Sequence, residues 1–305
     1  MTAVTVVIPA LNAAATLGRQ LDALRAQVDA PPFSVIVVDN GSTDRTADVA
    51  MAARAEGLDI AVVHEQRRGV NRARNAGVAA AAPGVVLLCD ADDVVDVRWV
   101  AELFSAIDDR HWGAGSIDYE SVNSRSTLAT WGAPSRAVPP VRVPYVDGTF
   151  GGNCGFITSM WECIGGFDDR LSGAGDENEF FARAHAAGFR IRVSPEASVG
   201  YTLRPGRRAW LRHRYRSGVG HGRAARCAGG RQFADVSRPA RSVPALLRVV
   251  LSAPLYIWTS RSRLEWAGSV LRQWGRLVGW VTSRSLVDTL RSSDGYPHSE
   301  GRLSG

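Results

Sequence analysis

Short apolar runs alternate with helical patterns through the first 110 residues, and this alternation limits the possible folds more than any other feature. Mostly β-branched residues, all of them aliphatic except Thr5, fill positions 4–8, 35–38, 60–63 and 85–88. Turn signals and apolar residues at helical spacing lie between these runs. Strand–helix alternation at this spacing predicts βαβ units. Right-handed crossovers join such units into one doubly wound, mostly parallel α/β sheet.

Three acidic residues follow the fourth run directly: Asp90, Asp92 and Asp93. In open α/β sheets, ligands bind beyond the carboxyl ends of the strands. Carboxylates crowded there repel one another unless a cation or a hydrogen-bonding ligand lies among them. Mg²⁺ and Mn²⁺ prefer oxygen ligands and often bridge carboxylates to phosphates. The sequence therefore predicts a metal–diphosphate site that uses Asp90 and Asp92, with an acidic loop and helix cap as the alternative.

Basic residues are concentrated in the C-terminal third of the chain. Residues 1–200 hold 17 arginines and 25 acidic residues, whereas residues 201–305 hold 19 arginines and five acidic residues, and there is no lysine. This asymmetry indicates an anionic partner. For the stretch 204–216, where arginines alternate with aromatic residues, three interpretations stay open. It binds pyrophosphate, it lies against anionic lipid headgroups, or it is a solvated face.

An amphipathic helix is predicted over 264–281, where apolar residues recur at helical spacing. The apolar residues are Leu264, Ala267, Val270, Leu271, Trp274, Leu277, Val278 and Val281. We expect this stripe to pack on its own domain or to lie at a membrane interface beside the tryptophans. The apolar stretch 243–258 is shorter than the ~20 residues that span a bilayer. The polar tail 292–305 is expected to be disordered.

Cysteine spacing and the first residues bear on the compartment. The four cysteines form no CxxC pair, so neither a zinc site nor a thioredoxin-type motif is predicted. Residues 4–8 already form a strand, without the basic and apolar segments of a signal peptide. We therefore expect the protein in the cytoplasm, with peripheral binding to the inner face of a membrane as an extension of that expectation.

Six motifs in this order resemble the family 2 glycosyltransferases, which bind nucleotide sugars on a Rossmann-like GT-A fold. They are Val6-Val7-Ile8-Pro9-Ala10-Leu11-Asn12, Val38-Asp39-Asn40-Gly41-Ser42-Thr43-Asp44, Arg74-Asn75-Ala76-Gly77, Asp90-Ala91-Asp92-Asp93, Gly165-Gly166-Phe167-Asp168 and Asp176-Glu177-Asn178-Glu179. The resemblance covers residues 3–200. It implies a GT-A catalytic domain over 1–203, with a nucleotide-sugar half over 1–110 and an acceptor-side half over 111–203. A basic helical extension over 204–291 would follow.

The resemblance also implies roles for single residues. The nucleotide would be bound by Pro9, Ala10, Asn12, Asp39, Arg72, Arg74 and Asp90. Asp39 would contact the nucleobase, most commonly uracil, so a UDP-sugar is the expected donor. Asp92, with Asp90, would ligate Mg²⁺ or Mn²⁺. Asp93, Gly152 and Asn153 are expected near the donor sugar or the acceptor, although a plain loop explains Gly151-Gly152-Asn153 equally well.

The pair Asp176-Glu177 is expected to hold the general base, but its order is the reverse of the family's usual Glu-Asp. The position of the family's general base aligns with Glu177, whereas its side-chain type, an aspartate, matches Asp176. We favour Glu177 as the base. One carboxylate base and a metal suffice for a single in-line displacement, which inverts the anomeric centre. The expected acceptor is a lipid-linked sugar or a glycan in cell-surface synthesis.

Other functions fit the sequence less well. A nucleotidyltransferase needs a glycine-rich basic loop after the first strand, and Pro9-Ala10-Leu11-Asn12 is not one. A nicotinamide-dependent enzyme needs the motif GxGxxG after a strand, and none of the predicted strands is followed by it. The reversed acidic pair leaves a catalytically inactive, sugar-nucleotide-binding or scaffold protein as the alternative. Nucleic-acid binding by the arginine-rich segment would be steeply salt-dependent, and we do not expect it.

Overall fold

The structure is a computed structural model that describes residues 2–138, 150–171, 173, 175–227, 239–253 and 259–291. Its N-terminal half alternates strands and helices as the sequence predicts. These elements are β1 (Ala3–Ala10), α1 (Leu17–Arg25), β2 (Ser34–Asp39), α2 (Thr46–Ala55), β3 (Ile60–His64), α3 (Val70–Ala80), β4 (Gly84–Cys89), β5 (Val94–Val95) and α4 (Trp99–Ser105). Cys89 is free and fully buried, as expected for the end of a core strand.

The sheet is mixed and mostly parallel in its N-terminal part. The later elements are β6 (His111–Asp118), α5 (Arg125–Trp131), β7 (Arg136–Ala137), β8 (Asn153–Ile157), α6 (Thr158–Ile164), α7 (Asp176–Ala186) and β9 (Arg190–Gly200). The strand order is β3-β2-β1-β4-β8-β6-β9-β5, and β7 pairs with β6. The first four strands are parallel, and β8 is antiparallel to both neighbours. The strand order reverses beside β1, which is where open α/β sheets bind ligands.

Helices cover both faces of the sheet, which confirms the predicted doubly wound arrangement. On one face, Leu17, Leu21 and Trp99 of α1 and α4 pack on the strands in one buried cluster. On the other face, Phe180 and Phe181 of α7 join residues of α3 and α6 in a second cluster. Because both faces are covered, the central strands are apolar throughout rather than alternating.

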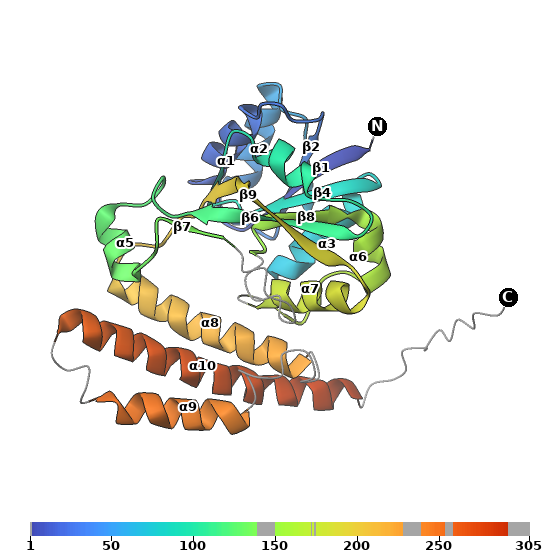
Figure 1. Cartoon of the computed structure of the whole chain (residues 1–305). Coiled ribbons are helices and arrows are strands. Elements are labelled where there is room, and N and C mark those ends of the chain that lie inside the picture. The colour runs from blue at the N-terminus through green and yellow to red at the C-terminus, as the bar shows by residue number, and fades with distance from the viewer. Residues whose placement is uncertain are drawn as a thin grey trace.

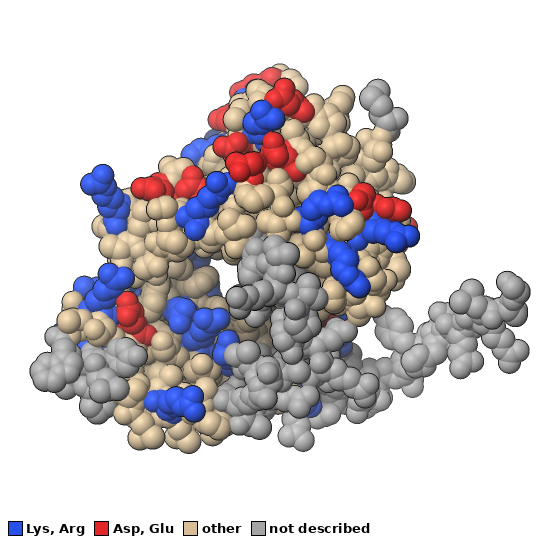
Figure 2. Space-filling model, in the orientation of Figure 1, with Lys and Arg blue, Asp and Glu red and all other residues tan. Residues whose placement is uncertain are grey.

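The C-terminal helices form a layer beside the sheet domain (Figure 1). They are α8 (Arg207–Cys227), α9 (Pro239–Leu251) and α10 (Ser260–Arg291). Helices α8 and α10 run in parallel and touch through glycines. A Cβ on Gly222 would lie 2.2 Å from the carbonyl oxygen of Arg276, and one on Gly279 would lie 2.1 Å from that of Val219. Arginines are the main charged side chains on this layer, whereas acidic side chains gather on the sheet domain (Figure 2).

The glycine contact leaves two residues of the apolar stripe on α10 exposed to solvent. The buried residues of this helix include Gly275, Arg276 and Gly279, because small residues let two backbones approach most closely. Trp274 and Val281 of the stripe are instead 53% and 65% exposed. These two residues do not pack on the domain, so at these positions the other expectation, a membrane interface, stays a prediction.

Helix α9 also presents apolar side chains to solvent: Val243, Leu247, Val250 and Leu251. Within the described ranges, no helix combines the length and the apolar character needed to cross a membrane. The tail 292–305 and part of the apolar stretch 243–258 lie outside the described residues, so the predictions made for them stay predictions.

Candidate active site

The predicted nucleotide-binding residues lie on one edge of the sheet. Ala10, at the end of β1, pairs with Asp39, at the end of β2. Asp90 follows β4, which is the other neighbour of β1. The carboxyl ends of three adjacent parallel strands therefore bring Pro9, Ala10, Asp39 and Asp90 to a common edge, as expected for a ligand site of an α/β sheet.

Asn12 fastens the two loops at this edge to each other, and Asp39 stabilises the turn of the second loop. Asn12 has a left-handed backbone, with φ of 51°. Its side-chain oxygen accepts a hydrogen bond from the backbone N–H of Thr43 at 2.8 Å, and its own N–H donates to Ser42 Oγ at 2.9 Å. Asp39 Oδ1 accepts from the N–H of Ser42 at 3.0 Å. The loops that would receive a nucleoside are thus held in place before any ligand binds.

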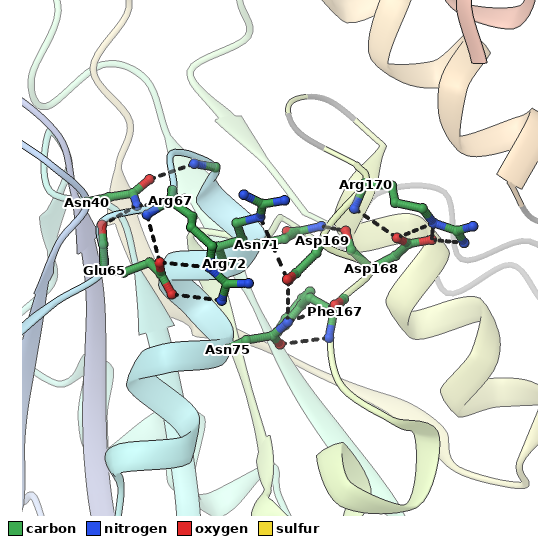
Figure 3. A network of polar contacts seen from close by, with 11 residues as sticks. Asn40, Glu65, Arg67, Asn71, Arg72, Asn75, Phe167, Asp168, Asp169 and Arg170 are labelled. Carbon is green, nitrogen blue, oxygen red and sulfur yellow. Dashed lines mark hydrogen bonds and ion pairs between the residues drawn. The ribbon is translucent and has the colours of Figure 1, made fainter. Parts of the chain in front are cut away.

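A polar network joins α3 to the segment before α7 (Figure 3). Asn75 donates to the carbonyl oxygen of Phe167 at 2.8 Å and accepts from the N–H of the same residue at 2.8 Å. Asn71 donates to the carbonyl oxygen of Asp168 at 3.0 Å. Arg72 Nε lies 3.7 Å from Asp169 Oδ2, so this arginine is directed toward the network. The Arg-Asn and Gly-Gly-Phe-Asp motifs therefore interlock, and they place Phe167 in the core.

A cavity of about 590 Å³ opens beside this edge. Six of the residues singled out from the sequence line it: Arg74, Asp90, Asp93, Gly152, Asp176 and Glu177. Pro9, Ala10, Asn12, Asp39 and Arg72 are not among its lining residues, and Asp92 lines a neighbouring cavity. The structure therefore gathers Asp90 and the predicted catalytic pair in one volume, whereas Asp92 faces the neighbouring cavity and the strand-end residues Pro9, Ala10 and Asp39 lie outside both.

Arg74 connects the two groups of carboxylates. Its guanidinium is buried, with Nη1 3.3 Å from Asp176 Oδ1 and Nη2 4.0 Å from Asp90 Oδ1. It also lies over the ring of Phe167, 5.6 Å from the ring centre. Burial alone would lower the pKa of Arg74, but the charges of Asp176 and then Asp90 outweigh it and raise that pKa. Arg74 is therefore a fixed positive charge between the end of β4 and the start of α7.

Two glycines let the chain before β8 lie against this ion pair. A Cβ on Gly151 would lie 2.5 Å from Arg74 Nη2, and one on Gly152 would lie 2.4 Å from Asp90 Oδ2. Contacts this short leave no room for a side chain. Gly152 is thus in direct contact with a predicted site residue, and its role is to allow close approach.

Carboxylates outnumber cations at the end of β4. Asp93 is only 2% exposed, and its Oδ1 accepts from the N–H of Thr202 at 2.9 Å. Its Oδ2 has no hydrogen-bond partner among the described residues. Burial, followed by the charge of Asp90, raises the pKa of Asp93 well above its usual value. Burial likewise raises the pKa of Asp90, Arg74 opposes this, and Asp92 adds to it.

This surplus of carboxylate oxygen fits a hard divalent cation. In the described part of the chain, no three or more His, Cys, Asp or Glu side chains form a complete metal cage. Mg²⁺ is commonly held by one or two carboxylates together with substrate phosphates, so an incomplete set is what such a site presents without its substrate. Asp90 and Asp92 have the right ligand type, and the unpartnered Asp93 oxygen lies close by in sequence.

The two residues of the acidic pair have different surroundings. Asp176 is 3% exposed, and its carboxylate accepts from the N–H groups of Gly173 and Glu177 at 3.2 and 2.7 Å, besides pairing with Arg74. Glu177 is partly exposed and lines the cavity. Burial, followed by Asp176, raises the pKa of Glu177 well above its usual value. Glu177 is therefore open to the cavity, whereas Asp176 is buried against Arg74.

Asn153 is a structural residue. It is fully buried, and its Oδ1 accepts from Trp99 Nε1 at 2.8 Å. Its Nδ2 donates to the carbonyl oxygens of Ser116 at 2.7 Å and Ala197 at 3.0 Å. These bonds tie β8 to β6, β9 and α4, so we do not include Asn153 in the proposed site.

Several aromatic cavity residues had not been singled out from the sequence. Tyr119, Trp131, Tyr201 and His213 all line the cavity. Trp131 of α5 packs on His213 with ring centres 4.9 Å apart and donates to the carbonyl oxygen of Arg204 at 3.1 Å. The alternation of arginine and aromatic residues in 204–216 was the only signal for His213. No signal marked Tyr119 or Trp131, because residues 111–150 have no clear periodicity.

Comparison with known proteins gives a consistent result. A family model described as Glycosyl transferase family 2 matches residues 5–157. An uncharacterized glycosyltransferase of Mycobacterium tuberculosis is 40% identical over 106 residues, which cover 35% of this chain and 44% of that protein. Succinoglycan biosynthesis protein ExoU of Rhizobium meliloti is 28% identical over 208 residues, which cover 63% and 59%. The chain thus spans about half the length of these curated relatives.

A solved structure has a similar fold. The mannosyltransferase PcManGT from Pyrobaculum calidifontis, in complex with GDP-Man and Mn²⁺, gives a TM-score of 0.57 at 19% identity. The match covers 95% of this chain and 80% of that one. At this identity the likeness shows the fold alone, and it confirms the GT-A type sheet expected from the sequence.

Proposed function

The chain belongs to glycosyl transferase family 2, and on this basis we propose that it transfers a sugar from a nucleoside diphosphate sugar to an acceptor hydroxyl. One observation carries the proposal. A single cavity contains Asp90 and Asp93 at the end of β4 and Glu177 at the start of α7. Arg74 joins the two sides by ion pairs. The donor's diphosphate and the acceptor hydroxyl would then meet within one volume.

Glu177 is the proposed general base. It takes the proton of the acceptor hydroxyl, the oxygen attacks the anomeric carbon, and the bond from that carbon to the diphosphate breaks with its electron pair on the leaving phosphate oxygen. Attack and departure on opposite faces invert the anomeric centre. Asp176 is the proposed positioning residue, because its carboxylate is occupied by backbone N–H groups and Arg74.

Asp92 and Asp90 are the proposed ligands of a Mg²⁺ or Mn²⁺ ion. When bound, the ion would act as a Lewis acid that neutralises charge on the departing diphosphate. The excess of carboxylates over cations around Asp90 supports this assignment. So does the presence of Mn²⁺ in the PcManGT complex, although that is a property of the relative.

The nucleoside edge is proposed to bind a UDP-sugar. Asp39 would accept a hydrogen bond from the base, with Pro9, Ala10 and Asn12 around the base and ribose and Arg72 nearby. The bonds that join Asn12 and Asp39 to the loop at 42–43 support a preformed pocket. GDP is the main competitor, since PcManGT was solved with GDP-Man.

The proposed acceptor is a glycan or a lipid-linked precursor of the cell surface. ExoU, a relative, is named for succinoglycan biosynthesis, which supports a polysaccharide or glycolipid product. Exposed Leu247 and Leu251 on α9 and exposed Trp274 on α10 lie in the arginine-rich layer of the molecule. This combination supports peripheral binding to an anionic membrane surface.

Titration calorimetry tests the proposal directly. UDP, GDP, dTDP and CDP would each be titrated into the protein with Mn²⁺ and, separately, with EDTA. We expect UDP to bind with Mn²⁺, the binding to fall sharply in EDTA, and Asp92→Ala to lose the metal-dependent part. Asp48→Ala, which removes an exposed aspartate of α2, is the matched control. Absence of binding by all four nucleotides would reject the proposal, and binding without sugar transfer would favour the inactive alternative.

A further inference from the structure

A second cavity adjoins the first one. It has a volume of about 660 Å³, and it shares Trp131, Tyr201 and His213 with the cavity that holds Glu177. Its lining also includes Asp92, the proposed metal ligand, and residues of α8. The two cavities therefore meet beside the proposed reaction centre, and α8 forms a wall of the second.

Four arginines line this second cavity, namely Arg204, Arg212, Arg216 and Arg223. We call them the arginine row. The last three lie on one face of α8, because their spacings of four and seven residues bring side chains back to the same side of a helix. At 1.5 Å per residue the helical part spans ~16 Å, which is longer than one diphosphate group.

The arginine row carries positive charge without a carboxylate partner in the described part of the chain. None of its four members forms an ion pair with a carboxylate of the described residues. Asp92 is the one acidic residue among the described residues that line this cavity. The Nε of Arg223 is buried and has no hydrogen-bond partner in the described part of the chain. Such a wall attracts an anion.

The far end of the row lies near the proposed base. A Cβ on Gly175, the residue before α7, would lie 3.4 Å from His221 Cα and 3.6 Å from Ala224 Cβ. Arg223 is thus on the stretch of α8 that touches the start of α7, where Glu177 accepts the acceptor's proton. The donor's diphosphate is proposed at Asp90 and Asp92, and Asp92 lines the same cavity as the row. The row therefore runs from beside the proposed metal ligand toward the start of α7, where the proposed base lies.

We propose that the arginine row binds phosphate on the acceptor, so that the substrate class is a phosphate-bearing acceptor. Guanidinium groups match phosphate oxygens through paired N–H donors. The inference rests on the proposed glycosyl transfer. The phosphate belongs either to a lipid phosphate or to a phosphodiester polymer; both present the same oxygens to the row.

The test measures binding of phosphate probes to the full chain. Farnesyl phosphate, farnesol and a short polyphosphate chain would be titrated with Mn²⁺ and a saturating concentration of the nucleoside diphosphate that binds best. We expect a phosphate probe to bind, and farnesol to bind at least about tenfold more weakly than farnesyl phosphate. A preference for farnesyl phosphate identifies a lipid source, and a preference for polyphosphate identifies a polymer.

Variants connect the binding to the row. Arg216→Gln with Arg223→Gln should weaken the preferred phosphate probe about tenfold and leave nucleotide binding unchanged. Arg207→Gln is the matched control, because Arg207 is exposed on the same helix and does not line the cavity. Circular dichroism and thermal unfolding confirm that each variant folds.

Three results would overturn the inference. They are displacement of the probe by the nucleotide, equal loss of nucleotide binding in the double variant, and equal binding of farnesyl phosphate and farnesol. The first two would assign the row to the donor's diphosphate. Failure of the proposed function is distinguishable, because it appears as absent nucleotide binding in the unmodified protein.

Discussion

At the scale of single residues, Arg74 determines how the site is built. Its ion pairs reach Asp90 after β4 and Asp176 at the start of α7, two positions 86 residues apart in the chain. Gly151 and Gly152 lie against Arg74 and Asp90 at a distance that leaves no room for a side chain. Asp176 is bonded to backbone N–H groups and Arg74, whereas Glu177 is partly exposed and lines the cavity, which supports the proposed positioning role of Asp176 and proton-accepting role of Glu177.

Replacing Glu177 by Gln should abolish most of the transfer reaction. The amide keeps the size of the side chain but cannot take a proton, and a general base contributes about 10²–10⁴ in rate. Nucleotide binding measured by calorimetry should stay unchanged. Asp176→Asn should affect kcat less, because that carboxylate does not meet the acceptor. A greater loss of kcat in Asp176→Asn than in Glu177→Gln would mean that Asp176 is the base and Glu177 the positioning residue. A product that retains the donor's anomeric configuration would reject the single displacement.

The pH dependence should report the environment of Glu177. Burial and the neighbouring Asp176 raise its pKa, and a base acts only when deprotonated. Activity should therefore fall as pH decreases through a value well above the ordinary glutamate pKa. The profile of kcat/KM measured at saturating metal gives this acid limb. An acid limb at the ordinary value would mean that another group is the base.

Asp93 should lower stability at neutral pH. Its folded-state pKa lies above the unfolded value, so the folded protein binds more protons between the two values and loses stability as pH rises through that window. Asp93→Asn keeps the acceptor oxygen for Thr202 and removes the charge. Thermal unfolding without metal should show a higher midpoint for the variant at pH 8 and no gain near pH 4. A lower midpoint at pH 8 would contradict this account.

The sequence identified most residues that line the site, but it did not separate direct from indirect roles. Gly152 and Asn153 are neighbours and were assigned together. Only the structure shows that Gly152 contacts Asp90 while Asn153 ties strands together in the core. Tyr119 and Trp131 were missed because long-range packing brings them to the cavity.

At the scale of elements, the strands were predictable wherever both faces of the sheet are covered. Because helices cover both faces, nearly all residues of β1, β2 and β4 are apolar, and this signal is easy to recognise in the sequence. Strand β9 covers Arg190–Gly200 but is not continuously apolar. Its register against β6 shifts after Gly115, and Pro195 and Glu196 interrupt its apolar pattern. The buried face of α10 was misjudged because glycine carries no hydrophobic signal.

Glycine contacts should be essential to the pairing of α8 with α10. In Gly222→Ala the new Cβ would lie 2.2 Å from the carbonyl oxygen of Arg276, so the helices must separate, at a cost of about 1–3 kcal/mol in unfolding free energy. Gly18→Ala on α1 is the control, because its Cβ would meet only Val49, at 3.9 Å. Alanine favours helix there, so denaturant unfolding should show a small gain. Equal changes in both variants would show that the contact is unimportant.

At the scale of the whole molecule, charge divides between the two layers, whereas both layers expose some apolar side chains. The sheet domain carries most of the acidic residues, while the helical layer carries arginines and exposed apolar side chains. A surface of this kind would bind an anionic bilayer in two ways: its arginines attract the lipid headgroups, and its apolar side chains are buried among the lipids.

The protein should therefore sediment with phosphatidylglycerol vesicles and not with phosphatidylcholine vesicles. Added salt should weaken this binding, since it screens exposed charges. Leu247→Asp on α9, at a side chain 56% exposed, should reduce it severalfold. Met51→Asp on α2, at 47% exposure, should have no effect. Equal loss in the two variants, or equal binding to both lipids, would argue against a membrane face on α9.

The parallel pairing of α8 with α10 sets an order of events during synthesis. The sheet domain and α8 leave the ribosome first, but α8 gains its glycine partner only after α9 and most of α10 have followed. At about 5–20 residues per second, the growing chain passes through an interval of several seconds with its sheet complete and its second cavity without a firm wall. On the proposed function, a nascent chain in that interval would already hold a nucleotide, and it would gain its acceptor site only once α10 has formed.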